Sequence, residues 1–318
     1  MFLYRETQKK EDSMKKLVKI LDYVLFAMLL MLQYSFSGEK LNIVTTTTDL
    51  ADLARNIGGD KVSVISLTKG NQDLHSIEPK PSMIINIKKA DILIVVGMDL
   101  DLWAKSLVEA ARNSKVMIGG KGYLDASVNI TKLDIPAKVD ASMGDIHIYG
   151  NPHYWLSPEN GKIISKTILD KLIEIQPTDA DYFKKNFDEY IVKLDQNIKK
   201  WKEMLKPFAG TKIVTYHDSW PYFAKEFNLS IDGFIELKPG IPPSPAHVVS
   251  LIQKIKADNV KLILAEPFYD IREAERISKD AGIKYIKVAS SVGAFDGTDS
   301  YIEMFDYNIS KIVDALSK

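Results

Sequence analysis

Three histidines are the side chains of this chain best suited to chemistry. The 318 residues include five histidines and no cysteine, so a transition-metal site would be built from His, Asp and Glu. His75, His153 and His217 each stand near proline or tryptophan residues that restrict the local backbone. Neutral imidazole nitrogens suit zinc and its neighbours in the first transition row, and three of them leave a fourth position for a carboxylate or a water. We therefore predict one metal site formed by these three histidines.

The spacing of these histidines leaves a second interpretation open. No two of them have the short separation of a helical zinc motif. Each could instead be a surface histidine or one that is hydrogen-bonded in the core. For the other two we expect ordinary roles: His147 as a solvated loop residue or an auxiliary metal contact, and His247 as an exposed residue in the first turn of a helix.

The composition indicates a globular protein and excludes one class of partner. With 46% hydrophobic and 26% charged residues, the chain has enough apolar material for about two domains. Lys+Arg and Asp+Glu both number 42, so the formal net charge is zero. Without a basic excess, nucleic acid is not expected as a partner.

The N-terminal segment has the pattern of a secretory signal peptide. Lysines between residues 15 and 19 precede an apolar run at 23–32, which is short for a membrane span. Ser35 and Ser37 then fit the −3 and −1 positions of a cleavage site. We predict that residues 1–37 are removed after Ser37 during export.

Two alternatives remain for this segment. It could be an uncleaved membrane anchor, and Met14 rather than Met1 could be the first residue. Because no cysteine is present at the cleavage site, we expect no lipid anchor. These features predict a periplasmic protein.

Strand and helix patterns alternate along the chain in two similar series. Asp49 is expected to cap the first helix. Ile43-Val44-Thr45 in the first series matches Ile213-Val214-Thr215 in the second. The predicted strands are 41–45, 62–67, 90–96, 211–215, 231–237 and 260–265, with helices near 50–57, 82–89, 102–111, 221–227 and 245–257. This order predicts an α/β fold of two related lobes with mostly parallel sheets, whose ligands bind at the carboxyl ends of the strands.

A long amphipathic helix is predicted between the two series. Apolar residues recur every three or four positions from Phe183 to Leu205. We expect a helix over 178–208 that joins an N-terminal lobe, 38–177, to a C-terminal lobe, 209–318, as a rigid connection.

Four segments resemble one known family, the substrate-binding proteins of zinc and manganese ABC transporters. These segments are TTTTDLADLARNIGGDKV, DLHSIEPKPS around His75, NPHYWLSP around His153 and YHDSWPYFAKEF around His217, followed by PPSPAHVVSLIQKIKADNVKLILAEP. The similarity covers roughly residues 41–316. It implies two α/β lobes joined by one long helix, with His75, His153 and His217 as metal ligands.

The resemblance also implies a function. A histidine at the third position is typical of the zinc branch, because manganese relatives usually place a carboxylate there. The implied cargo is Zn²⁺, with Mn²⁺ or Fe²⁺ as alternatives, and the implied partner is an ABC permease in the inner membrane. We expect a monomer without enzymatic activity, whose metal affinity falls below about pH 6.5 as imidazoles become protonated.

The fourth ligand is not fixed by the sequence. The family's first ligand loop usually has proline where this chain has Leu74, and the region 126–149 contains only His147 where many relatives have a histidine-rich loop. The usual aspartate position falls near 289–293, which contains no carboxylate. We favour Glu266, either as a ligand or as a partner that orients a histidine. Asp296, Glu78 and a water molecule are the alternatives.

Two other functional classes fit less well. A zinc hydrolase would also use three histidines and an open position, with Glu266 as a general base. An adhesin or structural protein could use the same fold, but no repeat or surface-anchoring motif indicates one.

Overall fold

The computed structural model describes residues 14–25, 40–136, 147–237 and 240–317. Residues 1–40 form a unit separate from 41–318, and 14–25 within it are helical and exposed. Among the described helices, none has both the length and the apolar character needed to span a membrane. The predicted cleavage point after Ser37 and most of the apolar run lie outside the described residues.

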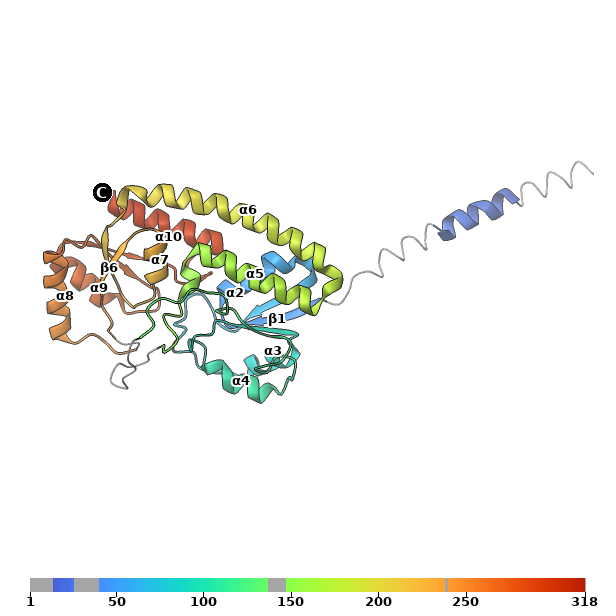
Figure 1. Ribbon diagram of the computed structural model, residues 1–318, viewed down its shortest axis with the longest axis horizontal. Helices are drawn as coiled ribbons and strands as arrows, with labels where there is room; N and C mark the ends of the chain where they lie inside the picture. The colour runs from blue at the N-terminus through green and yellow to red at the C-terminus, as the bar shows by residue number, and fades with distance from the viewer. Residues whose placement is uncertain (1–13, 26–39, 137–146, 238–239, 318) are drawn as a thin grey trace, which may run out of the picture. The chain divides into compact units, whose positions relative to one another are not determined.

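Two parallel four-stranded sheets form the framework of residues 41–318, which confirms the predicted α/β fold (Figure 1). The first sheet has the order β2-β1-β3-β4 and the second the order β6-β5-β7-β8. We call them, with their helices, the N-lobe and the C-lobe. The strands are β1 (Leu41–Thr45), β2 (Val62–Ser66), β3 (Ile92–Val95), β4 (Tyr123–Asp125), β5 (Lys212–Thr215), β6 (Ser230–Phe234), β7 (Leu262–Ala265) and β8 (Lys284–Lys287).

The matching sequence triplets occupy equivalent places in the two sheets. Ile43 of β1 pairs with Ile92 of β3, and Ile213 of β5 pairs with Leu262 of β7. Both triplets are therefore in central strands, where apolar side chains are buried on both faces. The predicted relation between the two halves is confirmed at the level of strand order and register.

Helices flank both sheets, and most begin where the sequence predicts. They are α2 (Thr48–Gly58), α3 (Pro81–Lys89), α4 (Trp103–Ala111), α5 (Pro158–Ile175), α7 (Pro221–Glu226), α8 (Pro245–Ala257), α9 (Ile271–Ala281) and α10 (Tyr301–Leu316). The prediction that Asp49 caps the first helix is wrong. The Thr47 hydroxyl accepts from the Leu50 backbone N–H, because the Asp49 carboxylate is turned toward the C-lobe.

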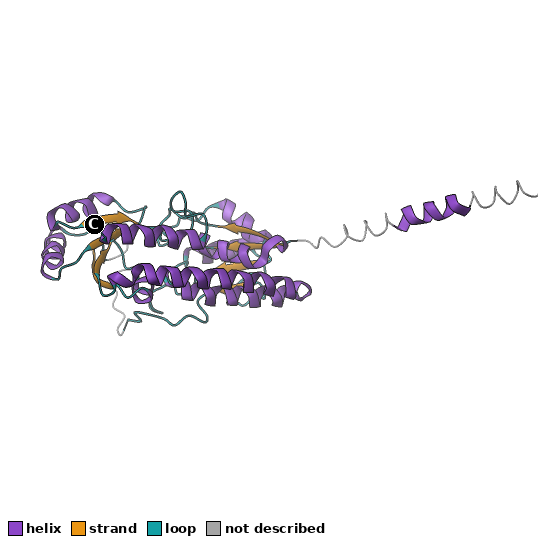
Figure 2. Cartoon of the chain, turned by 90° about the horizontal axis from the view of Figure 1, so that it is seen from above, coloured by secondary structure: helices purple, strands orange, loops and turns teal. Residues whose placement is uncertain are grey.

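The long helix predicted over 178–208 is present as α6 (Ala180–Leu205), with short 3₁₀ turns at 177–179 and 206–208. It packs along α5, α2 and α10, and the two views agree that α6 and α10 run side by side (Figures 1 and 2). Trp201 of α6 stacks on Phe305 of α10 with ring centroids 5.2 Å apart, and its Nε1 donates to Asp306. The helix is therefore built into a core that includes strands of both sheets. The predicted lobe boundaries at 177/178 and 208/209 stay predictions.

The loop after β8 ties the two lobes together at the carboxyl ends of their strands. The Val292 N–H donates to Asp49 Oδ1 at 3.0 Å, and Trp155 Nε1 donates to the Ser290 carbonyl at 2.8 Å. A Cβ on Gly70 would lie 2.1 Å from the Val292 carbonyl oxygen, so this approach requires glycine. The lobes therefore meet in close contact on both sides of the loop.

Asp49 is fully buried in this contact. Burial raises the pKa of its carboxyl to about 7, although the hydrogen bonds from Val292 and Ser291 oppose the rise. Its second oxygen, Oδ2, has no hydrogen-bond partner. A carboxylate held there in ionised form lowers the free energy of unfolding.

The raised pKa of Asp49 gives a stability prediction with a definite sign. Because the folded-state pKa of Asp49 lies above the ordinary value, its protonated carboxyl contributes to the free energy of unfolding. This contribution is fully present below about pH 4 and is lost as the pH rises through about 7. Asp49→Asn keeps an oxygen that can accept from Val292 and removes the titration. Between pH 5 and pH 8 we expect the free energy of unfolding of the variant to gain at least about 1 kcal/mol relative to wild type.

Urea denaturation of the metal-free protein at both pH values measures this difference. Asp314→Asn, at an exposed position of α10, controls for the loss of a carboxylate. Parallel pH profiles for wild type and Asp49→Asn would contradict the prediction.

Candidate metal centre

The three predicted histidines come together although 142 residues of sequence separate the first from the last. His75 lies in the loop between β2 and α3, His153 directly precedes the short turn Tyr154–Leu156, and His217 follows β5. One ligand atom from each lies within 4.8 Å of the others. The ring centroids are 4.9 Å apart for His75–His217, 5.2 Å for His75–His153 and 5.5 Å for His153–His217. This spacing suits three imidazoles around one ion.

The rings of His75 and His153 are oriented by the same kind of local contact. The side-chain oxygen of a residue two positions earlier accepts from the histidine backbone N–H and lies 3.0 Å from its ring Nδ1. Asp73 Oδ1 does this for His75, and Asn151 Oδ1 does it for His153. Both ligand loops therefore contain an Asx turn that fixes the ring as well as the backbone.

The third ring is oriented from another strand. His217 Nδ1 lies 3.4 Å from Oε2 of Glu236, a buried residue just after β6. The Glu236 backbone N–H donates to the Tyr216 carbonyl, which continues the pairing of β5 with β6 and brings the carboxylate beside the imidazole. Glu236 was not predicted from the sequence. Its position after a strand that neighbours β5 was the available signal.

These contacts assign the inward-facing atom of each ring. An oxygen faces Nδ1 in all three histidines, so the favoured tautomer carries its proton on Nδ1 and leaves the Nε2 lone pair free. Carboxylate or amide partners of this kind hold metal-binding histidines in place and raise their basicity. The three Nε2 atoms are thus the natural donors to a shared cation.

Burial disfavours protonation of two of the rings, His153 and His217. Burial lowers the pKa of His153 well below 6.5, and the neighbouring histidines add to this effect. Burial also lowers the pKa of His217, although Glu236 partly offsets it. Burial alone would raise the pKa of Asp73, but the hydrogen bonds and charge of His75 lower it below its ordinary value. The nitrogens of His153 and His217 are therefore available to a cation rather than occupied by a second proton.

Asn151 also links the two sides of the site. Its Nδ2 donates to the carbonyl of Asp218, the residue after His217, at 2.7 Å. The hydroxyl of Tyr222 donates to the Asn151 carbonyl at 3.0 Å. The loop that carries His153 is thereby fixed to the segment that carries His217.

Glu266 lies at the end of β7 and is completely buried, with 0% exposure. Its Oε1 accepts from Trp220 Nε1 at 2.9 Å, whereas Oε2 has no hydrogen-bond partner. Burial raises its pKa to about 7. Glu266 is not part of the group of ligand atoms formed by the three histidines, so a ligand role for it stays a prediction. The alternatives Glu78 and Asp296 are both exposed.

The remaining histidines differ in their relation to the site. His147 Nε2 lies 3.2 Å from His75 Nε2, and its ring centroid is 6.4 Å from that of His153. His247 of α8 is half-buried rather than exposed as expected, and its Nε2 lies 2.9 Å from the Phe234 carbonyl oxygen. Of the two, His147 lies beside the three histidines, in contact with His75.

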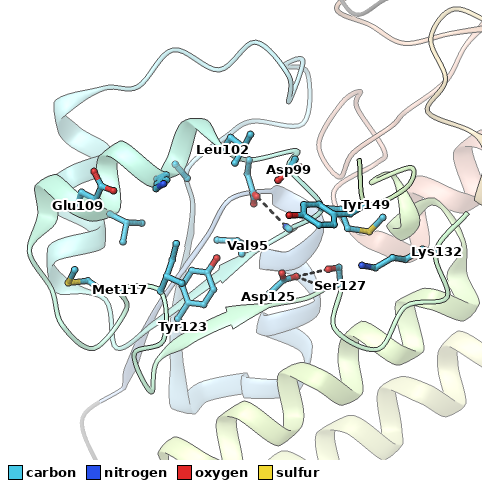
Figure 3. A pocket seen from close by; sticks show the side chains of 17 residues that line it. Val95, Asp99, Leu102, Glu109, Met117, Tyr123, Asp125, Ser127, Lys132 and Tyr149 are labelled. Carbon is cyan, nitrogen blue, oxygen red and sulfur yellow. Dashed lines mark hydrogen bonds between the residues drawn. The ribbon is translucent and has the colours of Figure 1, made fainter. Parts of the chain in front are cut away.

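A separate cavity of about 480 Å³ opens at the carboxyl ends of β3 and β4, and none of the three histidines lines it (Figure 3). Two half-buried carboxylates that line it are already engaged. Asp101 accepts from the Thr46 hydroxyl and the Val96 N–H, and Asp125 accepts from the Ser127 backbone and hydroxyl. These groups hold the loops after the two strands.

Comparison with known proteins places this geometry in a family. The family described as zinc-uptake complex component A, periplasmic, matches residues 43–315. The chain belongs to this family. It is a family of metal-binding proteins of uptake systems rather than of enzymes, which agrees with the resemblance carried by the histidine segments.

Individual relatives cover nearly the whole chain. The manganese ABC transporter substrate-binding lipoprotein PsaA of Streptococcus anginosus is 30% identical over 291 residues, which cover 89% of this chain and 91% of the relative. The metal ABC transporter substrate-binding lipoprotein ScbA of Streptococcus cristatus is 31% identical over 290 residues, covering 88% and 90%. A zinc-bound deletion mutant of ZnuA has a TM-score of 0.74 at 25% identity and covers 87% of this chain and 98% of its own.

The buried position of His153 predicts a large effect of its removal. His153→Ala deletes one donor and leaves a cavity that water can enter, so we expect zinc affinity to fall at least about 100-fold. Competitive titration against a chromophoric chelator measures the change. His247→Ala removes an imidazole outside the centre and should bind zinc as wild type does. Unchanged affinity in His153→Ala would remove His153 from the ligand set.

Glu236 predicts a smaller effect through the orientation of His217. Glu236→Ala removes the oxygen that faces Nδ1, and we expect affinity to fall about 10- to 100-fold. Glu236→Gln retains an oxygen acceptor and should restore most of the loss. If the alanine and glutamine variants bind equally tightly, Glu236 does not position the ring.

Proposed function

We propose that this protein captures Zn²⁺ outside the cytoplasmic membrane and delivers it to an ABC permease in the inner membrane. The observation that carries the proposal is the convergence of three imidazoles, drawn from both lobes, on one point. Such a site binds a divalent cation without bringing a compensating charge of its own. The family match to a zinc-uptake component supports the same assignment.

The donor atoms favour zinc over manganese. Imidazole nitrogens suit Zn²⁺, whereas Mn²⁺ prefers carboxylate and carbonyl oxygens. The two carboxylates nearest the rings, Asp73 and Glu236, face the Nδ1 atoms and so lie on the outer side of His75 and His217. The alternative, a manganese or iron carrier, is supported by the names of relatives such as PsaA.

Binding is favoured over catalysis by the burial of the site. His153 and His217 expose only 4% and 5% of their surface, which leaves little access for a substrate larger than an ion or a water. Glu266, the general base that a hydrolase would need, is fully buried and hydrogen-bonded to Trp220. A closed site of this kind suits retention of a cargo.

The place of action and the partner follow from the sequence pattern and the family. The lysine-rich and apolar segment before residue 38 supports export to the periplasm through a signal peptide. The substrate-binding relatives belong to ABC transporters, so the receiving partner is an inner-membrane permease. We expect the protein to act as a monomer that presents one ion at a time.

Metal selectivity is the decisive test. In competitive titrations of the protein without residues 1–37, we expect Zn²⁺ to bind at least about 100-fold more tightly than Mn²⁺, because nitrogen donors rank zinc well above manganese. Elemental analysis of protein purified without added metal identifies the ion that it retains.

Two outcomes would overturn the proposal. Equal or tighter binding of Mn²⁺ would assign the protein to the manganese alternative. Zinc-dependent turnover of ester or peptide substrates, abolished in His153→Ala, would support the hydrolase instead.

A further inference from the structure

Three nitrogen donors leave one position of a four-coordinate zinc ion to be filled. The described residues near the three rings that could fill it are Glu266, Glu236, Asp73 and His147. They differ in which side of the imidazoles they approach. The residue that completes the site determines how the protein discriminates between metals. The inference therefore rests on the proposed function of a metal carrier.

His147 approaches from the side on which the metal would bind. Its Nε2 lies 3.2 Å from the Nε2 of His75, the atom left free by the contact of His75 Nδ1 with Asp73. Two nitrogens bound to one tetrahedral zinc ion are about 3.3 Å apart, given Zn–N distances of 2.0–2.1 Å. The separation of the two Nε2 atoms is therefore close to that of two ligands on a shared ion.

The carboxylates approach from less suitable directions. Asp73 and Glu236 contact Nδ1 atoms, which face away from the inward Nε2 atoms of the same rings. Glu266 Oε1 accepts from Trp220 Nε1, so only its Oε2 remains for a metal. His147 is the candidate whose Nε2 lies in contact with an inward-facing nitrogen, the Nε2 of His75.

The backbone holds His147 next to a ligand loop. The Gly150 N–H donates to the His147 carbonyl at 3.0 Å and closes a turn, in which Gly150 has a φ of 105° that favours glycine. The next residue, Asn151, donates its N–H to the Leu133 carbonyl at 2.8 Å and its side chain orients His153. His147 and His153 are thus presented by one short anchored segment.

We propose that His147 is the fourth ligand and that the protein holds its cargo in a four-histidine site. His147 must approach His153 and His217 more closely than it does in this structure, because its ring centroid lies 6.4 Å from that of His153. Four neutral imidazoles leave the +2 charge undiminished and provide no oxygen donor, a combination that suits Zn²⁺ and Co²⁺ and disfavours Mn²⁺. His147 is then a determinant of metal selectivity.

Cobalt reports directly on the ligand set. In the wild-type protein without residues 1–37, bound Co²⁺ should give the visible absorption of a tetrahedral all-nitrogen site, and X-ray absorption of the zinc form should count four imidazoles. In His147→Ala we expect three imidazoles and an oxygen, a shifted Co²⁺ spectrum and zinc affinity lowered about 10- to 100-fold. The selectivity of His147→Ala for Zn²⁺ over Mn²⁺ should also be lower than that of the wild type.

Two further measurements separate ligation from a structural role. Free imidazole added to the Co²⁺ form of His147→Ala should occupy the open position and restore the wild-type spectrum, whereas it should leave His247→Ala unchanged. Glu266→Gln should keep the wild-type spectrum.

The outcomes distinguish this proposal from the broader one. If wild type binds zinc with three imidazoles, or if His147→Ala retains the wild-type Co²⁺ spectrum, His147 is not a ligand although the zinc-carrier function stands. A spectrum altered by Glu266→Gln and not by His147→Ala would assign the fourth position to Glu266. If wild type fails to bind zinc, the proposed function itself falls.

Discussion

The metal centre depends on a fixed relation between the two lobes. His75 and His153 belong to the N-lobe and its following segment, and His217 belongs to the C-lobe, so any relative shift separates their nitrogens. The loop after β8 opposes such a shift through Asp49 on one side and Trp155 on the other. Helix α6, packed against α5 and α10, restrains the lobes at a distance from the site. The contacts across the interface bring three loops that are distant in sequence into one site.

The cost of burying polar groups at this interface explains several of its contacts. Neutral imidazoles are cheaper to bury than charged ones, and each has an oxygen beside Nδ1. The carboxyls of Asp49 and Glu266 are each buried with one oxygen that has no hydrogen-bond partner, and burial raises both pKa values to about 7. Such groups remain near the boundary between their neutral and ionised forms at physiological pH. The interface is therefore tightly packed but not fully satisfied in its hydrogen bonds.

Much of the fold and part of the site could be predicted from the sequence. The central strands were evident because buried apolar runs such as Ile213–Thr215 are short and continuous, and the three histidines were found through their segments. The cap of α2 was misassigned because Thr47 and Asp49 are equally suitable by residue type. Strand β8 was missed because lysines flank its two apolar residues. Glu236 and the contact of His147 with His75 depend on chain folding, which spacing does not reveal.

The two ways of orienting the rings make the site asymmetric. His75 and His153 are each held by a neighbour two residues earlier, so their poses are properties of short loops. His217 is held by Glu236 from the adjacent strand, so that ring and its carboxylate belong to the C-lobe as a pair. A small displacement of the C-lobe that breaks the bonds of Asn151 with Asp218 and Tyr222 would withdraw this pair together. Unloading would then begin at His217, with the cargo passing through an intermediate still attached to the N-lobe side.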